Sequence, residues 1–331
     1  MLWIEKYRPR TFDEICGQPE VVRHLRRFAA GRTVPHLLLV GRHGTGKSAA
    51  VECLARGLYG DAWEQNTTIF CTGDLFLQGK QYLEADERFS HLYRKDAGLI
   101  TNFKHIVKEY ASLRPLDTEF KLMVFDDASS LPFEAQQALR RIMERYSATC
   151  RFLYTTTQQS SIIPAISSRC LPLFFAPVAA DDIHAHLASI ISREHGPRRE
   201  VPSDDCDLII QASRGDLRKA VMYLQLLAEG GETDLAEVSQ SETTAIASSA
   251  FAALQARDLE KAQHLVGLLM LEYGLSGREI VSELRTVARR EYNDERITLA
   301  LADTDFVLGH AGSDYLQLDA LLARILAEVF L

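Results

Sequence analysis

The chain has 331 residues, of which 47% are hydrophobic and 25% charged, and its formal net charge is −8. We therefore expect a soluble protein of two or three domains that does not coat nucleic acid over its whole surface. Its apolar runs are shorter than the ~18 residues of a membrane span, its first ten residues carry charges unlike a signal peptide, and its scattered cysteines favour a reducing cytosol over a disulfide framework or zinc site.

Residues 1–177 alternate between strand-like and helix-like segments. Short apolar segments predict strands at 37–40, 67–71, 121–125, 150–155 and 171–175. Strands that are apolar along their whole length are typical of a parallel sheet covered on both faces. We therefore predict an α/β domain built from βαβ units.

Residues 41–48 follow the first predicted strand and read GRHGTGKS. They fit the phosphate-binding pattern G-x-x-x-x-G-K-[ST] in its strand–loop–helix context. Glycines let backbone N–H groups turn toward a phosphate, and the following helix adds its dipole. Lys47 is expected to reach the β- and γ-phosphates, and the Ser48 hydroxyl to bind Mg²⁺. The predicted nucleotide-binding residues here are Gly41, Arg42, His43, Gly44, Thr45, Gly46, Lys47 and Ser48.

The strand at 121–125 leads into two carboxylates, Asp126 and Asp127. Asp126 is expected to hold Mg²⁺, directly or through water, and Asp127 to orient the attacking water. Many ATPases have Glu at the second position. Asp127 is one methylene shorter, and a misplacement of about 1 Å costs ~10²-fold in rate, so binding should survive better than hydrolysis. The alternative is a pair of aspartates that caps the following turn.

The strand pattern stops after residue 175. Amphipathic helices are predicted at 181–194, 203–213 and 216–227, and the polar stretch 239–244 indicates a boundary. From residue 245 onward the sequence is helix-like, with interruptions at 273–277 and 309–312. The predicted domains are therefore 1–177, 178–238 and 239–331.

Several segments carry a resemblance to one known family. They are residues 3–9 (WIEKYRP), 11–15, 17–18, 35–39, 137–144, 166–170 (ISSRC), 215–220 (GDLRKA), 273–277, 303–306 and 317–323. In this order they resemble the small subunit of replication factor C, the archaeal and eukaryotic sliding-clamp loader of the AAA+ class. The resemblance runs nearly from end to end.

The resemblance implies a fold and a function. The fold is a RecA-like AAA+ P-loop domain, a small helical lid and an all-α collar that assembles a ring. The function is ATP-dependent opening of the clamp and its loading onto primed DNA. The implied cofactors are ATP and Mg²⁺, and the implied partners are other replication factor C subunits in a pentamer, a PCNA-like sliding clamp and the primed-DNA backbone. The implied cellular location of the protein is the cytosol of an archaeal-type cell, in association with the nucleoid, or the nucleus of a eukaryote.

The resemblance also assigns residue roles. Arg169 in the Ser-Arg-Cys motif would act on the neighbouring subunit's ATP; the alternative is a strand-edge ion pair. Arg218 would be the second sensor, on the lid over the chain's own nucleotide; the alternative is an exposed helix arginine. A strip near the N-terminus would pack against adenine, or simply join domains. It consists of Tyr7, Arg8, Pro9 and Ile15.

The chain departs from the family pattern in two places. Thr157 aligns with the Asn of the first sensor, and sliding the alignment by one residue offers Gln158 instead. Residues 71–76 also depart from the family's N-A-S-D-E-R, and the connection from there to residue 121 is longer than usual. Asp127 and Thr157 together indicate a divergent paralogue that binds ATP but has weakened hydrolysis at its own site. The alternatives are a structural ring subunit that only binds nucleotide, and a different AAA+ remodelling ATPase.

The helix-like segment 133–146 carries a basic face in an acidic chain. Arg141 and Arg145 are i, i+4 neighbours, and the family places this helix against the primer–template backbone. Arg140, Arg141 and Arg145 are therefore expected to bind phosphates independently of sequence. The alternative is a solvated face on which Glu144 pairs with Arg140.

The segment 76–113 is a candidate for clamp docking. Its aromatic residues look exposed in the sequence; they include Tyr82, Phe89 and Tyr93. The alternative is a local insertion with its own small core.

Overall fold

The computed structural model describes residues 1–113, 115, 118–195, 203–213, 215–229, 242–271, 275–309 and 313–330. The chain divides into two compact units, Met1–Glu232 and Thr233–Leu331, which we treat separately. The predicted boundary at 238/239 lies outside the described residues, as do residues 273–274 of the predicted interruption at 273–277 and residues 310–312 of that at 309–312. The predicted division at 177/178 falls within the first unit and stays a prediction.

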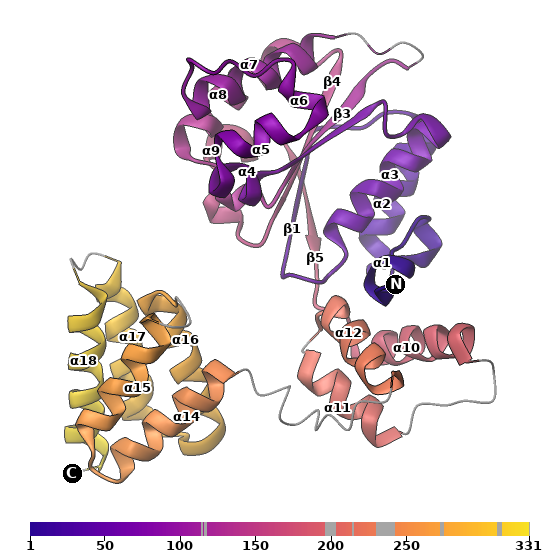
Figure 1. The fold of residues 1–331 in the computed structure, drawn as a ribbon. Coiled ribbons are helices and arrows are strands. Elements are labelled where there is room, and N and C mark those ends of the chain that lie inside the picture. The colour runs from indigo at the N-terminus through magenta and orange to yellow at the C-terminus, as the bar shows by residue number, and fades with distance from the viewer. Residues whose placement is uncertain are drawn as a thin grey trace. The chain divides into compact units, whose positions relative to one another are not determined.

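Among the described residues, the first unit contains five parallel strands in the order β2-β3-β4-β1-β5 (Figure 1). The strands are β1 (Leu37–Gly41), β2 (Thr67–Cys71), β3 (Lys121–Asp126), β4 (Cys150–Thr156) and β5 (Leu171–Phe175). Each predicted strand is confirmed to within one residue. Because β1, β3 and β4 are adjacent and parallel, their carboxyl ends meet at one edge of the sheet.

Helices cover both faces of this sheet, as Figure 1 shows. Successive strand residues point to opposite faces, and the core accordingly has two halves. One half, with Leu37 and Leu39, packs against α2 (Pro19–Gly31) and α3 (Lys47–Tyr59). The other, with Leu38, packs against α7 (Leu99–Ser112) and α8 (Phe133–Tyr146). The predicted α/β architecture is confirmed.

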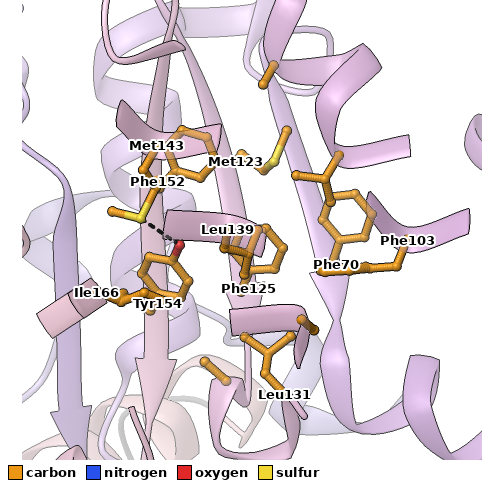
Figure 2. Close-up of a cluster of buried hydrophobic side chains, with 14 of the residues drawn as sticks. Phe70, Phe103, Met123, Phe125, Leu131, Leu139, Met143, Phe152, Tyr154 and Ile166 are labelled. Atoms are coloured by element: carbon orange, nitrogen blue, oxygen red, sulfur yellow. Dashed lines mark hydrogen bonds between the residues drawn. The ribbon is translucent and has the colours of Figure 1, made fainter. Parts of the chain in front are cut away.

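Aromatic side chains fill the second half of the core (Figure 2). The Phe125 ring on β3 stacks on Phe70 of β2 and on Tyr154 of β4, with centroids 5.4 and 5.2 Å apart. The buried Tyr154 hydroxyl donates a hydrogen bond to the Met143 sulfur on α8, at 3.1 Å. Because these rings are in contact across three strands, the strands have little freedom to slide past one another. The core therefore fixes the ends of β3 and β4 relative to each other and to α8.

The segment between β2 and α7 forms α4 (Thr72–Gln78), α5 (Lys80–Ala85) and α6 (Glu87–Ser90). The expectation that its aromatic residues are exposed is wrong. Phe89 is fully buried and stacks on Phe70, with centroids 4.8 Å apart. Tyr82 and Tyr93 are partly buried against the same core. The segment therefore extends the main core and does not form a small core of its own.

Shorter elements and a group of three helices complete the first unit. The short elements are α1 (Trp3–Lys6), η1 (Phe12–Glu14), η2 (Gly60–Ala62), η3 (Ala128–Ser130), η4 (Gln159–Ser161) and α9 (Pro164–Ser167). The three helices are α10 (Ala180–His195), α11 (Ser203–Ser213) and α12 (Leu217–Ala228). They agree with the predicted lid helices to within one residue at each end. The N-terminus contacts this group, because the Trp3 backbone N–H donates to Gln225 Oε1 at 2.8 Å.

Helices make up the second unit where the structure describes it. They are α14 (Glu242–Gln255), α15 (Leu259–Leu271), α16 (Gly277–Val287), η5 (Ala288–Tyr292), α17 (Glu295–Leu308), α18 (Asp314–Ile325) and η6 (Leu326–Phe330). Helical spacing buries Ile280, Leu284 and Val287 on one face of α16. Gly277 donates its N–H to Asp314 Oδ2 at 3.0 Å, and a Cβ there would lie 2.8 Å from the same oxygen. The predicted all-α unit is confirmed.

Across the described parts of both units, every helix is too short or too polar to span a membrane.

Candidate nucleotide site

A cavity of about 320 Å³ lies at the carboxyl ends of β1, β3 and β4. It brings together residues predicted from five separate parts of the sequence. Those lining it are Tyr7, Arg8, Pro9, Ile15, His43, Gly44, Thr45, Gly46, Lys47, Ser48, Asp126, Asp127, Thr157 and Arg218. The wall does not include Gly41, Arg42, Arg169 or the arginines of α8.

The loop 41–48 has the backbone shape that a phosphate cradle needs. Gly44 and Gly46 have φ values of +68° and +96°, which glycine adopts without the clash of a Cβ. Helix α3 begins directly after Gly46, at Lys47. The unpaired N–H groups at a helix start favour an anion. Backbone geometry and helix position therefore both suit a bound phosphate.

Lys47 is buried at the base of this loop. Its Nζ donates hydrogen bonds to the carbonyl oxygens of Gly41 and Arg42, both at 2.7 Å. Burial lowers the pKa of Lys47, and Arg218 lowers it further, while Asp126 opposes the shift. Loss of solvation makes the ammonium a stronger partner for an anion that enters the loop.

Asp126 is the centre of a cluster of oxygen atoms. Its Oδ1 accepts hydrogen bonds from Ser48 Oγ at 2.8 Å and from Thr155 Oγ1 at 2.6 Å. Carboxylate and hydroxyl oxygens are the donors that Mg²⁺ prefers, and Mg²⁺ sites commonly use one or two carboxylates with phosphates and water. Within the described residues, no three His, Cys, Asp or Glu side chains gather as a metal site. The donor set therefore fits Mg²⁺ held together with a nucleotide.

Sequence reasoning missed Thr155. Besides its bond to Asp126, the Thr155 Oγ1 accepts the Asp127 backbone N–H at 3.1 Å. The sheet register explains this position: Phe125 pairs with Tyr154, so the next residues, Asp126 and Thr155, lie opposite each other. Thr157 lies past the strand end on the cavity wall, and its hydroxyl forms no hydrogen bond within the described chain.

Asp127 has an unusual backbone and an occupied carboxylate. Its φ is +56°, a left-handed conformation that is uncommon outside glycine. Its two carboxylate oxygens accept hydrogen bonds from Ser129 Oγ at 2.5 Å and Ser130 Oγ at 2.7 Å. These partners are serine hydroxyls of the next turn. The Asp127 side chain accepts no backbone N–H of that turn, so the capping role considered as an alternative is not present. Asp127 also lines the cavity. Its carboxylate would orient a water molecule there if it released the two serine hydroxyls.

The lid meets the phosphate loop through the start of α12. Asp216 caps this helix by accepting the Lys219 N–H at 3.1 Å, and the Leu217 N–H donates to the Gly44 carbonyl at 3.1 Å. This contact places Arg218 on the cavity wall. At this position the Arg218 guanidinium is suited to contact the phosphates of a nucleotide bound in the cavity.

The N-terminal strip joins the lid to α3 beside the cavity. The Tyr7 hydroxyl donates to Glu194 Oε1 on α10 at 2.8 Å, and Arg8 forms an ion pair with Glu52 on α3. Pro9 and Ile15 line the cavity with them. The strip thus makes packing contacts and also supplies apolar surface to the cavity.

Arg169 follows α9, outside the cavity. Its Nη2 lies 2.5 Å from Glu144 Oε1, and its Nη1 donates to the Ala165 carbonyl at 2.6 Å. The ion pair considered as an alternative is therefore present. Its side chain remains 33% exposed, so the guanidinium is open to a molecule outside the chain.

The arginines of α8 differ in their partners. Arg140 Nε lies 3.5 Å from Glu144 Oε1, so the pairing considered as an alternative for this helix is present. Arg141 and Arg145 are exposed, and neither forms an ion pair with another described residue. The Arg145 guanidinium lies over the Tyr146 ring, 5.7 Å from its centroid. Two of the three candidate DNA-binding arginines are therefore open to a phosphate.

Comparisons with known proteins agree with these features. A family model described as "DNA polymerase III, delta subunit" matches residues 17–179, and one described as "Replication factor C C-terminal domain" matches residues 242–324. The replication factor C small subunit of Archaeoglobus fulgidus is 34% identical over 98% of this chain and 97% of its own. That of Methanococcus vannielii is 33% identical over 98% of each chain.

Solved structures share the fold at low identity. A single-residue variant of Thermotoga maritima RuvB has a TM-score of 0.51 and 16% identity over 84% of this chain and 85% of its own. The Aeropyrum pernix ORC1 protein, solved in complex with DNA, has a TM-score of 0.51 and 18% identity over 88% of this chain and 84% of its own. These likenesses support the AAA+ fold alone.

Proposed function

This chain belongs to the replication factor C small-subunit family, and from that premise we propose that it works in a clamp-loader ring. In this proposal the ring binds ATP, opens a PCNA-like sliding clamp and closes it on primed DNA, and hydrolysis releases the loader. The collar joins the chain to other replication factor C subunits in a pentamer. The place of action is an archaeal-type cytosol at the nucleoid, or the nucleus in a eukaryote.

The observation that carries the proposal is the convergence of Lys47, Ser48 and Asp126 at the sheet edge. Lys47 would exchange its two loop carbonyls for the β- and γ-phosphate oxygens, which are stronger acceptors because they are charged. Ser48 and Asp126, whose side-chain oxygens lie 2.8 Å apart, would supply ligands to Mg²⁺. When bound, the ion supplies charge neutralisation at the phosphate oxygens.

Two arginines would complete the nucleotide sites of the ring. Arg218 on the lid would contact the phosphates of the chain's own ATP. Arg169 lies outside the chain's own cavity and is partly exposed, so its phosphate would belong to a neighbouring subunit. Arginine is suited to both tasks because its guanidinium is planar, permanently charged and bidentate.

Hydrolysis at the chain's own site is proposed to be weak. The Asp127 carboxylate is shorter than the usual Glu, and both of its oxygens accept serine hydroxyls. Thr157 lacks the reach of an Asn amide. These observations favour, as a second candidate, a subunit that binds ATP and lends Arg169 but hydrolyses little.

DNA contact is proposed for the exposed side of α8. Arg141 and Arg145 would bind backbone phosphates without reading bases, and Arg140 would join them when released from Glu144. The clamp contact is not assigned to residues 76–113, because Phe89 is buried and Tyr82 and Tyr93 pack against the core.

The experiment that tests the proposal combines binding and assembly. Lys47→Ala should weaken ATP binding to the isolated chain at least tenfold by calorimetry. The wild-type chain, mixed with its partner subunits, should give a ring of defined mass that loads a clamp onto primed DNA. Unchanged ATP affinity in Lys47→Ala would remove the site assignment, and a chain that joins no ring would remove the loader function.

A further inference from the structure

Glu144 lies between two arginines with separate proposed roles. Its Oε1 is 3.5 Å from Arg140 Nε, one turn earlier on α8. The same oxygen is 2.5 Å from Arg169 Nη2, which follows α9. One carboxylate oxygen thus contacts both the basic face of α8 and the arginine proposed to act on a neighbour's ATP.

Arg169 is held at two points of its guanidinium. Glu144 binds one terminal nitrogen, and the Ala165 carbonyl accepts from the other at 2.6 Å. A guanidinium has five N–H donors in one plane, so other donors remain for a phosphate. Holding the plane in advance reduces the side-chain entropy that is lost when the phosphate binds.

We infer that Glu144 is a positioning residue for Arg169 and that it couples Arg169 to DNA bound on α8. This inference rests on the proposed function of Arg169. Arg140 and Arg169 compete for a single carboxylate oxygen. A DNA phosphate that draws Arg140 away leaves that oxygen to Arg169 and tightens the contact that orients it. DNA on α8 therefore favours hydrolysis at the neighbouring site.

The size of the effect follows from the exposure of the three side chains. Arg140 is 46% exposed, Glu144 47% and Arg169 33%. Ion pairs at such exposed positions contribute little free energy. Removing the pair should therefore change the rate of ATP hydrolysis by only about two- to fivefold. Glu144 thus adjusts Arg169, and its removal should not abolish hydrolysis.

Glu134 provides a matched control on the same helix. It forms an ion pair with Lys104 on α7 at 2.7 Å, and it contacts neither Arg140 nor Arg169. Glu134→Gln and Glu144→Gln therefore each remove one negative charge from α8, with one exposed ion pair lost at Glu134 and two at Glu144. Only Glu144→Gln removes the contact with Arg169.

The test uses the assembled ring, in which ATP hydrolysis is measured with and without primed DNA. Glu144→Gln should lower kcat about two- to fivefold toward the Arg169→Ala value, leave KM for ATP unchanged and reduce the stimulation by DNA. Glu144→Asp, which keeps the charge, should recover part of kcat. Arg140→Ala should raise kcat without DNA, because the competitor for Glu144 is gone. Glu134→Gln should match wild type.

Distinct results would overturn the inference. If Arg169→Ala lowers kcat but Glu144→Gln does not, Arg169 acts without Glu144. A kcat that rises in Glu144→Gln would mean that Glu144 restrains Arg169 instead of positioning it. If Arg169→Ala keeps full hydrolysis, the trans role in the proposed function fails, and the inference fails with it.

Discussion

The Asp216 carboxylate lies so close to Gly44 that a Cβ at position 44 would be 1.7 Å from Asp216 Oδ1. Asp216 belongs to the lid and Gly44 to the phosphate loop. The two segments also share the hydrogen bond from the Leu217 N–H to the Gly44 carbonyl. The lid helix that carries Arg218 is therefore seated directly on the loop, and its position depends on the absence of a side chain at residue 44.

Gly44→Ala tests this seating. The new Cβ would displace Asp216 and break the bond to Leu217, so we expect ATP affinity to fall at least about tenfold, with part of the decrease coming from the positive φ. Gly79→Ala is the control, because Gly79 has a φ of +66° and no atom near its Cβ position. It should lose stability but keep ATP affinity. Affinity is measured by calorimetry and stability by urea unfolding.

A second substitution separates the clash from the backbone strain. In Gly44→Ala with Asp216→Gly, position 216 has no side chain that could clash with the new Cβ, and glycine is tolerated at the start of α12 almost as well as aspartate. This double variant should recover part of the ATP affinity. If it binds no better than Gly44→Ala alone, the strained backbone explains the weaker binding and the lid contact does not.

The sequence predicted the sheet and the phosphate loop well because their signals are local. Strand segments are apolar along their whole length, and the loop motif fixes spacing and glycines within eight residues. The predicted Asp126 likewise stands directly after an apolar strand. Such features depend little on the rest of the chain, and the structure places them as expected.

Features that depend on contacts between distant segments were harder to predict. The run Thr155-Thr-Thr157 offers three hydroxyls, and only the pairing of β3 with β4 selects Thr155 as the partner of Asp126. Phe89 stands in a polar segment and looked exposed, yet its ring stacks on Phe70 of β2. Both outcomes follow from tertiary packing, which a residue's immediate neighbours do not encode.

His36 should make stability depend on pH. Its Nδ1 accepts the Phe152 N–H at 3.1 Å, and burial, helped by Arg151, lowers the pKa of His36 from 6.5 to about 4. Between pH 6.5 and pH 4, His36 is therefore protonated in the unfolded chain and neutral in the folded chain. The free energy of unfolding decreases as the pH falls through this range. From pH 7 to pH 5 this amounts to about 2 kcal/mol.

Urea unfolding at the two pH values measures this dependence. His36→Gln should remove most of the pH-dependent decrease in stability, although it lowers stability at pH 7 if the amide fails to replace Nδ1. His91→Gln, at an exposed position, serves as the control and should behave as wild type. A His36→Gln chain that loses as much stability as wild type between pH 7 and pH 5 would assign the dependence to other groups.

Asp127→Glu should raise the rate of ATP hydrolysis. The longer side chain reaches further into the cavity, and correcting a misplacement of about 1 Å is worth up to ~10²-fold. ATP affinity should not change, because Lys47, Ser48 and Asp126 are untouched. Hydrolysis is measured in the assembled ring with all other subunits made inactive. A flat rate would mean that the site is adapted to Asp127, or that Thr157 sets the limit.

Arg141→Ala combined with Arg145→Ala should weaken binding of the assembled ring to primed DNA. Each arginine that neutralises a phosphate releases counterions, so the slope of log K against log salt should fall by about one for each phosphate that is no longer neutralised. Affinity should fall equally for different DNA sequences, because phosphate contacts read no bases. Arg23→Ala with Arg27→Ala on α2 removes the same charge from another exposed helix face and should leave the slope unchanged. If both double variants flatten the slope equally, the DNA responds to the net charge of the subunit, and α8 is not its binding face.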